Sequence, residues 1–141
     1  MLPHRVNDLR WGWNGDLVIG VSGDLAQTEP NPLLSFLQEA KTRLQSDLYD
    51  WYAHPHLGAA LSEIIGEPNS KKTAETGKSR IIASLTRDGF VAKNLIAVRY
   101  VPVSRHQILY IVNISLPDVT NDDVLQVSLL LNTQECQLTF V

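Results

Sequence analysis

Apolar positions follow a helical period through the middle of the chain. From Asn31 onward they recur at spacings of three and four, at Leu33, Leu37, Ala40, Leu44 and Leu48. Such spacing places apolar side chains along one face of an α-helix. Asn31 is a favoured N-cap and Pro32 a favoured first helical residue. We therefore predict an amphipathic helix, whose apolar face packs either in the chain's own core or partly on a partner subunit.

A second helix is predicted to begin near Ser70 and to end at Arg87-Asp88-Gly89. Its apolar positions are Ala74, Gly77, Ile81, Ile82 and Leu85. Glycine inside a helix costs about 1 kcal/mol relative to alanine, so we expect Gly77 to allow a close approach to a neighbouring element. A shorter helix is predicted over residues 57–65, because the sequence Gly66-Glu67-Pro68-Asn69 breaks the pattern.

The last third of the chain changes to a period of two, which is typical of β-strands. We predict strands over residues 95–103, 108–116, 124–131 and 136–141, with an acidic loop at 117–123. Pro102 places the first strand at an edge or at a strand end, since proline has no N–H to donate. The last strand alternates up to Val141, which predicts a free end and an edge open to pairing.

Near the N-terminus, the sequence Asn14-Gly15-Asp16-Leu17 is followed by the similar sequence Ser22-Gly23-Asp24-Leu25. Gly-Asp pairs favour turns and the apolar run between the two copies favours a strand, so a β-hairpin is expected over 14–28. Gly23-Asp24 could also bind a cation, although a turn is the commoner use. The predicted fold is thus a single α+β domain, 1–141. Its parts are the hairpin, a helical part over 31–88 and a three- to four-stranded, mainly antiparallel sheet over 94–141.

A connector over residues 49–58 separates the two helical regions. It contains Trp51, Tyr52, Pro55 and Gly58. Proline fixes its own φ and glycine permits backbone angles that other residues avoid, so the segment should form a rigid turn after the first helix. We expect Trp51 to be at least half buried and to anchor this structural connector.

The amino-acid composition argues against several classes of function. The chain has 141 residues, 44% hydrophobic and 19% charged, with a net charge of −3. This is an ordinary globular balance without the basic surface of a nucleic-acid-binding protein. No apolar run reaches the length of a membrane span, and the start lacks the apolar core of a signal peptide. Cys136 is the single cysteine, so no internal disulfide forms, which is compatible with a reducing cytoplasm.

The candidate catalytic and metal-binding residues form no diagnostic motif. The carboxylates that could form a glycosidase pair are Glu39, Asp47, Asp50, Glu63 and Glu67. No sequence spacing identifies such a pair, since its geometry is set by the fold. His54 and His56 lack a third ligand at a diagnostic spacing. Cys136 has no histidine near it in sequence. We therefore expect no catalytic site, no metal and no cofactor.

Two tryptophans flank Gly12 close to the N-terminus. Trp11 and Trp13 either pack on the predicted hairpin or face a partner, since tryptophan is enriched at interaction hot spots.

The order of these elements resembles the baseplate wedge proteins of contractile phage tails. This sheath-initiator family is often labelled lysozyme-like. The likeness covers nearly the whole chain from about Gly15. It includes the connector, seen here as Asp50-Trp51-Tyr52-Ala53-His54-Pro55-His56-Leu57-Gly58, and the strand 95–103. Two departures are evident. Tyr49-Asp50 replaces the family's leading Gly-Glu, and Gly89-Phe90-Val91-Ala92-Lys93 stands where some members have Glu-Pro-Arg, so contacts of that motif are not carried over.

The resemblance implies a non-enzymatic structural protein of the virion, assembled in the host cytoplasm and present in six copies around the tail. Its partners would be the tail sheath protein, other baseplate wedge proteins, and tail tube or hub proteins, without nucleic acid or membrane. The sheath would add strands to the C-terminal sheet, at an edge that we assign to Leu129, Leu130, Gln137, Leu138, Thr139 and Phe140. The helices would bind wedge proteins. A peptidoglycan-cleaving enzyme and an adaptor of a bacterial injection apparatus are the alternatives.

Overall fold

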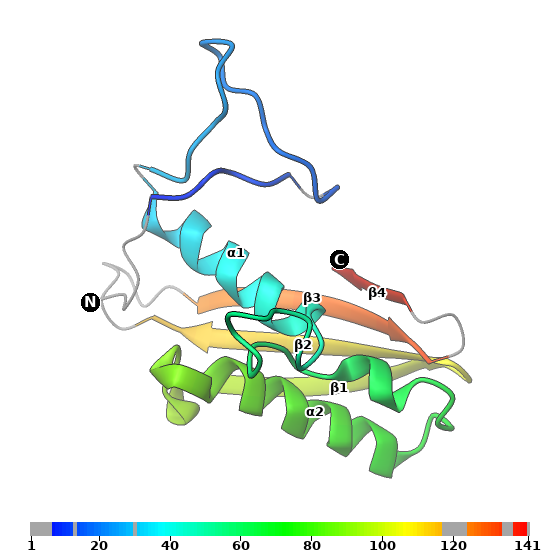
Figure 1. The fold of residues 1–141 in the computed structure, drawn as a ribbon. Helices are drawn as coiled ribbons and strands as arrows, with labels where there is room; N and C mark the ends of the chain where they lie inside the picture. Colours follow the sequence, from blue (N-terminus) through cyan, green and yellow to red (C-terminus); the bar gives the residue numbers. More distant parts are fainter. Residues whose placement is uncertain (1–6, 13, 30, 117–123, 134–136, 141) are drawn as a thin grey trace. The chain divides into compact units, whose positions relative to one another are not determined.

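The computed structural model describes residues 7–12, 14–29, 31–116, 124–133 and 137–140. By internal contacts the chain forms two compact units, Met1–Thr42 and Arg43–Val141. Within the described residues the larger unit carries the helix α2 and the β-sheet (Figure 1). The predicted acidic loop 117–123, Trp13 and Cys136 lie outside the described residues.

The first unit does not confirm the predicted hairpin. Its described residues contain three isolated antiparallel bridges, which join Leu9 to Gln27, Trp11 to Leu17 and Ile19 to Leu25. The bridged leucines are spaced eight residues apart. Each follows an aspartate whose Oδ1 accepts the leucine N–H at 2.7–2.8 Å, at Asp8, Asp16 and Asp24. The two Gly-Asp-Leu sequences therefore lie at repeated turns of the backbone, and the chain turns several times instead of once.

Backbone hydrogen bonds link the three turns in a closed ring. The N–H of Arg10 donates to Ala26 O at 2.8 Å, that of Val18 to Arg10 O at 3.1 Å, and that of Ala26 to Val18 O at 2.8 Å. The three residues are spaced eight apart, like the bridges. Residues 8–28 thus have an approximate threefold repeat that sequence periodicity over so short a span did not reveal.

Helix α1 spans Pro32–Gln45, so it begins where the sequence predicts and ends before Leu48, the last residue of the predicted pattern. The Asn31 Oδ1 accepts the Leu33 N–H at 3.0 Å, which satisfies one of the free donors of the first turn. Ala40 and Leu44 of the predicted apolar face are buried, together with Phe36, whereas Leu33 and Leu37 are only partly buried. The helix crosses the boundary between the units, and its last turn, from Arg43, belongs to the second.

Helix α2 spans Lys71–Thr86 and begins where the sequence places it. Ser70 is the N-cap, with its Oγ accepting the Thr73 N–H at 3.2 Å. Beyond Thr86, Asp88 and Gly89 adopt positive φ values of 59° and 69°, so the chain reverses near the predicted stop. Short 3₁₀ helices are η1 Leu61–Ile64, η2 Arg87–Gly89 and η3 Lys93–Leu95.

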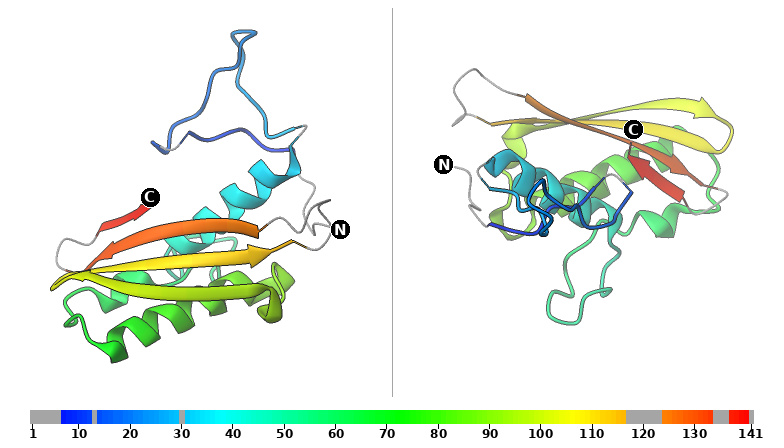
Figure 2. Two further views of the ribbon diagram at one scale, coloured as in Figure 1. Left: turned by 180° about the vertical axis from the view of Figure 1, so that it is seen from behind. Right: turned by 90° about the horizontal axis from the view of Figure 1, so that it is seen from above.

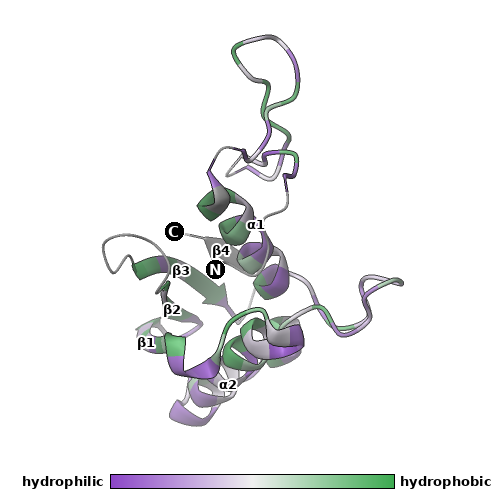
Figure 3. Ribbon diagram, turned by 90° about the vertical axis from the view of Figure 1, so that its left-hand side faces the viewer, coloured by the Kyte–Doolittle hydropathy of each residue, from purple (hydrophilic) through white to green (hydrophobic). Residues whose placement is uncertain are grey.

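The sheet has four antiparallel strands in the order β1-β2-β3-β4. Their bounds are Ile96–Ser104, Gln107–Ser115, Val124–Asn132 and Gln137–Phe140. The α+β fold and the antiparallel sheet are therefore confirmed. Figure 2 shows α2 lying along one face of the sheet. Along β2 and β3 the buried residues alternate with more exposed ones. Figure 3 shows hydrophobic residues along β3.

The contact between α2 and the sheet is centred on Tyr110 of β2. Its side chain is fully buried and its hydroxyl donates to Ala74 O at 3.1 Å. A Cβ on Gly77 would overlap this hydroxyl and would lie 2.7 Å from Tyr110 Cζ. Only glycine leaves room for the ring, which confirms the predicted close approach at Gly77.

Candidate functional site

The two outer strands of the sheet are β1 and β4, and β4 is the shorter. It pairs only with Leu129–Asn132 of β3 in the described part of the chain. Gln137, Leu138, Thr139 and Phe140 therefore lie at an edge, where one side of the backbone has no strand in the described sheet. The preceding half of β3, Val124–Ser128, pairs with β2 and with no described strand on its other side.

Leu129 and Leu130 do not lie at the edge. They sit in β3, between Tyr110 and Leu109 of β2 on one side and Phe140 and Thr139 of β4 on the other. The Leu129 side chain is also fully buried. The sequence identified the strand but not its neighbours, because the order of strands in a sheet cannot be read from alternation.

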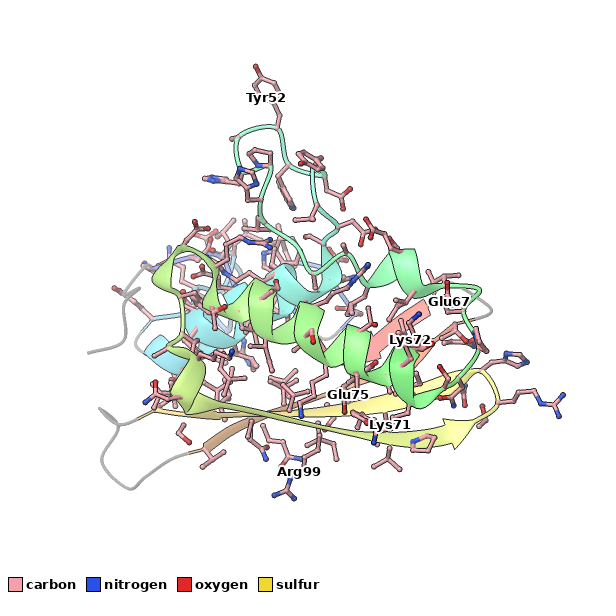
Figure 4. All side chains as sticks on the ribbon, turned by 90° about the horizontal axis from the view of Figure 1, so that it is seen from below. Tyr52, Glu67, Lys71, Lys72, Glu75 and Arg99 are labelled. Carbon is pink, nitrogen blue, oxygen red and sulfur yellow. The ribbon has the colours of Figure 1, made fainter. Side chains whose placement is uncertain are left out.

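The opposite edge, on β1, is built differently. Pro102 offers no N–H, and the pairing register shifts between Pro102 and Ser104, leaving Val103 without a partner residue in β2. The β1 edge is also tied to α2, since the Tyr100 hydroxyl donates to Glu75 Oε1 at 2.8 Å. This hydrogen bond to the carboxylate raises the pKa of Tyr100. Figure 4 shows Glu75 on α2 beside β1.

The connector forms a compact loop whose two ends meet. The Ala59 N–H donates to Ser46 O at 2.9 Å, and the Tyr49 N–H donates to Pro55 O at 2.8 Å. Gly58 has a φ of 141°, and a Cβ there would lie 2.6 Å from Ser46 O. The structure thus accounts for glycine at this predicted connector position, because no larger residue fits between the ends.

Arginine side chains from the α2 region hold the base of this loop. Arg87 Nη1 donates to the carbonyl oxygens of His56 and Gly58, the latter at 3.2 Å. Arg80 donates to Ala60 O and pairs with Glu63 at 2.9 Å. Sequence reasoning missed both residues, since a long-range contact from a cation to a backbone carbonyl leaves no local pattern.

The aromatic residues of the connector point largely to solvent. Tyr52 is fully exposed, and in Figure 4 it lies at the tip of the loop, pointing away from α2 and the sheet. Trp51 is 49% exposed, at the limit of the expected half burial, and its Nε1 donates to Ser46 Oγ at 3.1 Å. Tyr49 is 75% exposed and Pro55 is partly buried. The loop is anchored through its backbone more than through its aromatic rings.

Two of the candidate catalytic carboxylates in the second unit, those of Glu63 and Asp50, have partners within that unit. Glu63 is paired with Arg80, and the Asp50 Oδ2 accepts the Asp47 N–H at 2.9 Å. Glu67 is exposed, and Figure 4 places it near the start of α2. Glu39 belongs to the first unit.

His54 and His56 are exposed in the connector. Among the residues that the structure describes, no three histidine, cysteine, aspartate or glutamate side chains are grouped to hold a metal ion. In the same part of the chain, no helix combines the length and the apolar character needed to cross a membrane.

No protein-family model matches the sequence, and neither a curated protein nor a solved structure is significantly similar to it. The surfaces described above therefore have to be interpreted from their own geometry. Two surfaces stand out: the β4 edge, whose outer side has no described strand, and the connector loop, which exposes aromatic side chains.

Proposed function

We propose that this chain is a structural component of a contractile phage tail baseplate wedge, in which it initiates assembly of the sheath. The resemblance described from the sequence gives the class of assembly. The observation that carries the proposal is the incomplete edge at β4, which pairs with Leu129–Asn132 and leaves Val124–Ser128 of β3 open on that side in the described sheet.

Strand addition at such an edge is physically favourable. Each added residue satisfies backbone N–H and C=O groups along the edge, and alternate side chains supply specificity. A strand from the sheath subunit can run beside β4, or continue in line with it along Val124–Ser128. The same contact, repeated by later sheath rings, extends the polymer. The chain acts in this proposal as a template without catalysis.

A proline scan tests the edge. Proline removes one N–H donor without changing the net charge, and on an edge strand alternate N–H groups point outward. Single substitutions at Gln137, Leu138 and Thr139 therefore cover both orientations. We expect at least one variant that folds normally by circular dichroism and fails to start sheath in a tail-assembly assay.

Val103→Pro in β1 is the matched control, because Val103 lies at the register shift and has no partner residue in β2. It should start sheath like the wild type. If every folded β4 variant starts sheath of normal length, the sheet edge is not the template.

The absence of catalysis is tested separately. We expect the purified chain to clear a peptidoglycan suspension no faster than buffer. Clearing that is abolished by Glu63→Gln or Glu67→Gln would support the enzyme instead.

A further inference from the structure

With its paired ends Ser46 and Ala59, the connector loop spans residues 46–59 and combines three properties. It projects from the second unit, it exposes large aromatic side chains, and its backbone is fixed. Figure 4 shows the projection, with Tyr52 at the tip. A turn that served only to reverse the chain would not need Tyr49, Trp51 and Tyr52 on its outer surface.

The backbone of the loop is fixed in a conformation that costs free energy. Tyr49 has a φ of 70°, and Ala60, directly after the loop, has a φ of 52°; both lie in the left-handed region that non-glycine residues seldom occupy. Hydrogen bonds hold this shape, from the Asp50 N–H to Asp47 O at 3.3 Å, from His54 to Trp51 O at 3.1 Å and from Leu57 to His54 O at 3.0 Å. Such strain is common where a loop is shaped for binding.

The exposed side chains are themselves partly oriented. The Trp51 indole is held by Ser46 Oγ, and the rings of Tyr49 and His56 meet edge to face at 6.5 Å. Tryptophan and tyrosine dominate the hot spots of protein interfaces, and a loop ordered before binding loses little conformational entropy in the complex. Both features favour a protein partner over a purely local role.

The charge of the loop indicates the chemistry of the partner. Between residues 46 and 59 the formally charged side chains are Asp47 and Asp50, both acidic, while Arg87 is engaged with the carbonyl oxygens of His56 and Gly58. A loop whose formally charged side chains are both acidic complements a surface rich in lysine and arginine. It disfavours an anionic membrane surface.

We propose that this loop is a docking site that inserts Tyr49, Trp51 and Tyr52 into an apolar pocket with a basic rim on a neighbouring baseplate protein. This inference rests on the proposed function, because it takes the partner from the same assembly. It assigns attachment to the loop and strand templating to the β4 edge, so the two surfaces act at different steps.

The test uses purified tails assembled without this chain as the probe and measures binding of added chain by co-sedimentation. The variant Tyr49→Asn with Tyr52→Ala removes two aromatic rings, and asparagine tolerates the positive φ at position 49. Its melting temperature should equal that of the wild type, while its affinity for the tails falls at least about tenfold, as for hot-spot residues. Val101→Ser, which changes an exposed apolar residue on β1, is the matched control and should bind normally.

Salt and charge provide a second readout. Wild-type binding should weaken between about 0.05 and 0.5 M NaCl, because rim charges are screened. Asp47→Asn should reduce this salt dependence. A salt-independent affinity would contradict the basic rim.

The outcomes separate the two proposals. If the wild type binds tails and the double variant binds equally well, the docking loop is wrong and the sheath proposal stands. If the wild type does not bind at all, both fail. If the wild type instead binds phosphatidylcholine vesicles or purified peptidoglycan, and the double variant loses that binding, the loop recognises another class of target and the protein-docking proposal is overturned.

Discussion

The two edges of the same sheet are built in opposite ways. The β1 edge contains Pro102 and a register shift, and its Tyr100 is hydrogen-bonded to α2. The β4 edge is a short strand that covers only part of β3 in the described residues. Features such as proline and irregular pairing protect edges from unwanted strands. In the proposal, this difference separates a β1 edge that resists pairing from a β4 edge that a partner strand extends.

Helix α2 packs on the sheet that carries both edges through the contact between Gly77 and Tyr110. Disrupting this contact is therefore expected to cause the largest loss in the free energy of unfolding. Gly77→Val places two methyl groups where the Tyr110 ring lies and should destabilise the fold by about 3 kcal/mol, as severe overpacking does. Urea unfolding measures this change. Ser79→Ala, on the exposed side of the same helix, is the control and should change stability by less than about 0.5 kcal/mol. A Gly77→Val protein as stable as the wild type would show that α2 does not approach β2 as described.

Alkaline titration probes the same contact without changing its shape. Burial, and secondarily the charges of Tyr100 and Glu75, raise the pKa of Tyr110 to about 12. The neutral form is thus favoured in the fold. The associated stability is present below pH 10 and is lost as the pH rises from about 10 to 12. We expect the wild type to lose about 2–3 kcal/mol over this range.

Tyr110→Phe is the comparison protein for this titration. It lacks the ionisable hydroxyl, so its stability should fall less steeply above pH 10, although it starts lower by about 1 kcal/mol through loss of the hydrogen bond to Ala74. Parallel pH profiles for the two proteins would show that Tyr110 ionises freely.

The smallest effect concerns the β1 edge alone. Tyr100→Phe removes the exposed hydrogen bond to Glu75 and should cost less than about 1 kcal/mol in the free energy of unfolding. It should leave sheath initiation unchanged, since β1 is not the proposed template. A Tyr100→Phe variant that folds normally and fails to start sheath would reverse the roles assigned to the two edges.

Local signals predicted much of the fold. Asn31 and Ser70 mark the starts of both helices because their side chains cap the first turn, and the period of two located β1 to β3 within two residues. The close approach at Gly77 was also predictable, because a helical glycine has few other uses. These features depend on neighbours in sequence.

Features that depend on contacts between residues far apart in sequence were harder to predict. The neighbours of Leu129 and Leu130 follow from strand order, and the ring in the first unit follows from hydrogen bonds between residues eight apart. The exposure of Tyr52 depends on arginines that hold the loop base from elsewhere in the chain. Sequence identified the residue types of both candidate surfaces, and tertiary contacts determined which elements lie beside them.

The most direct measurement of the central claim is a cryo-EM map of the assembled tail. The account predicts density for an added strand from the sheath beside β4 or along Val124–Ser128 of β3, in all copies of this chain. Strand density beside β1, or sheath contacts confined to the helices with the β4 edge left open, would contradict it.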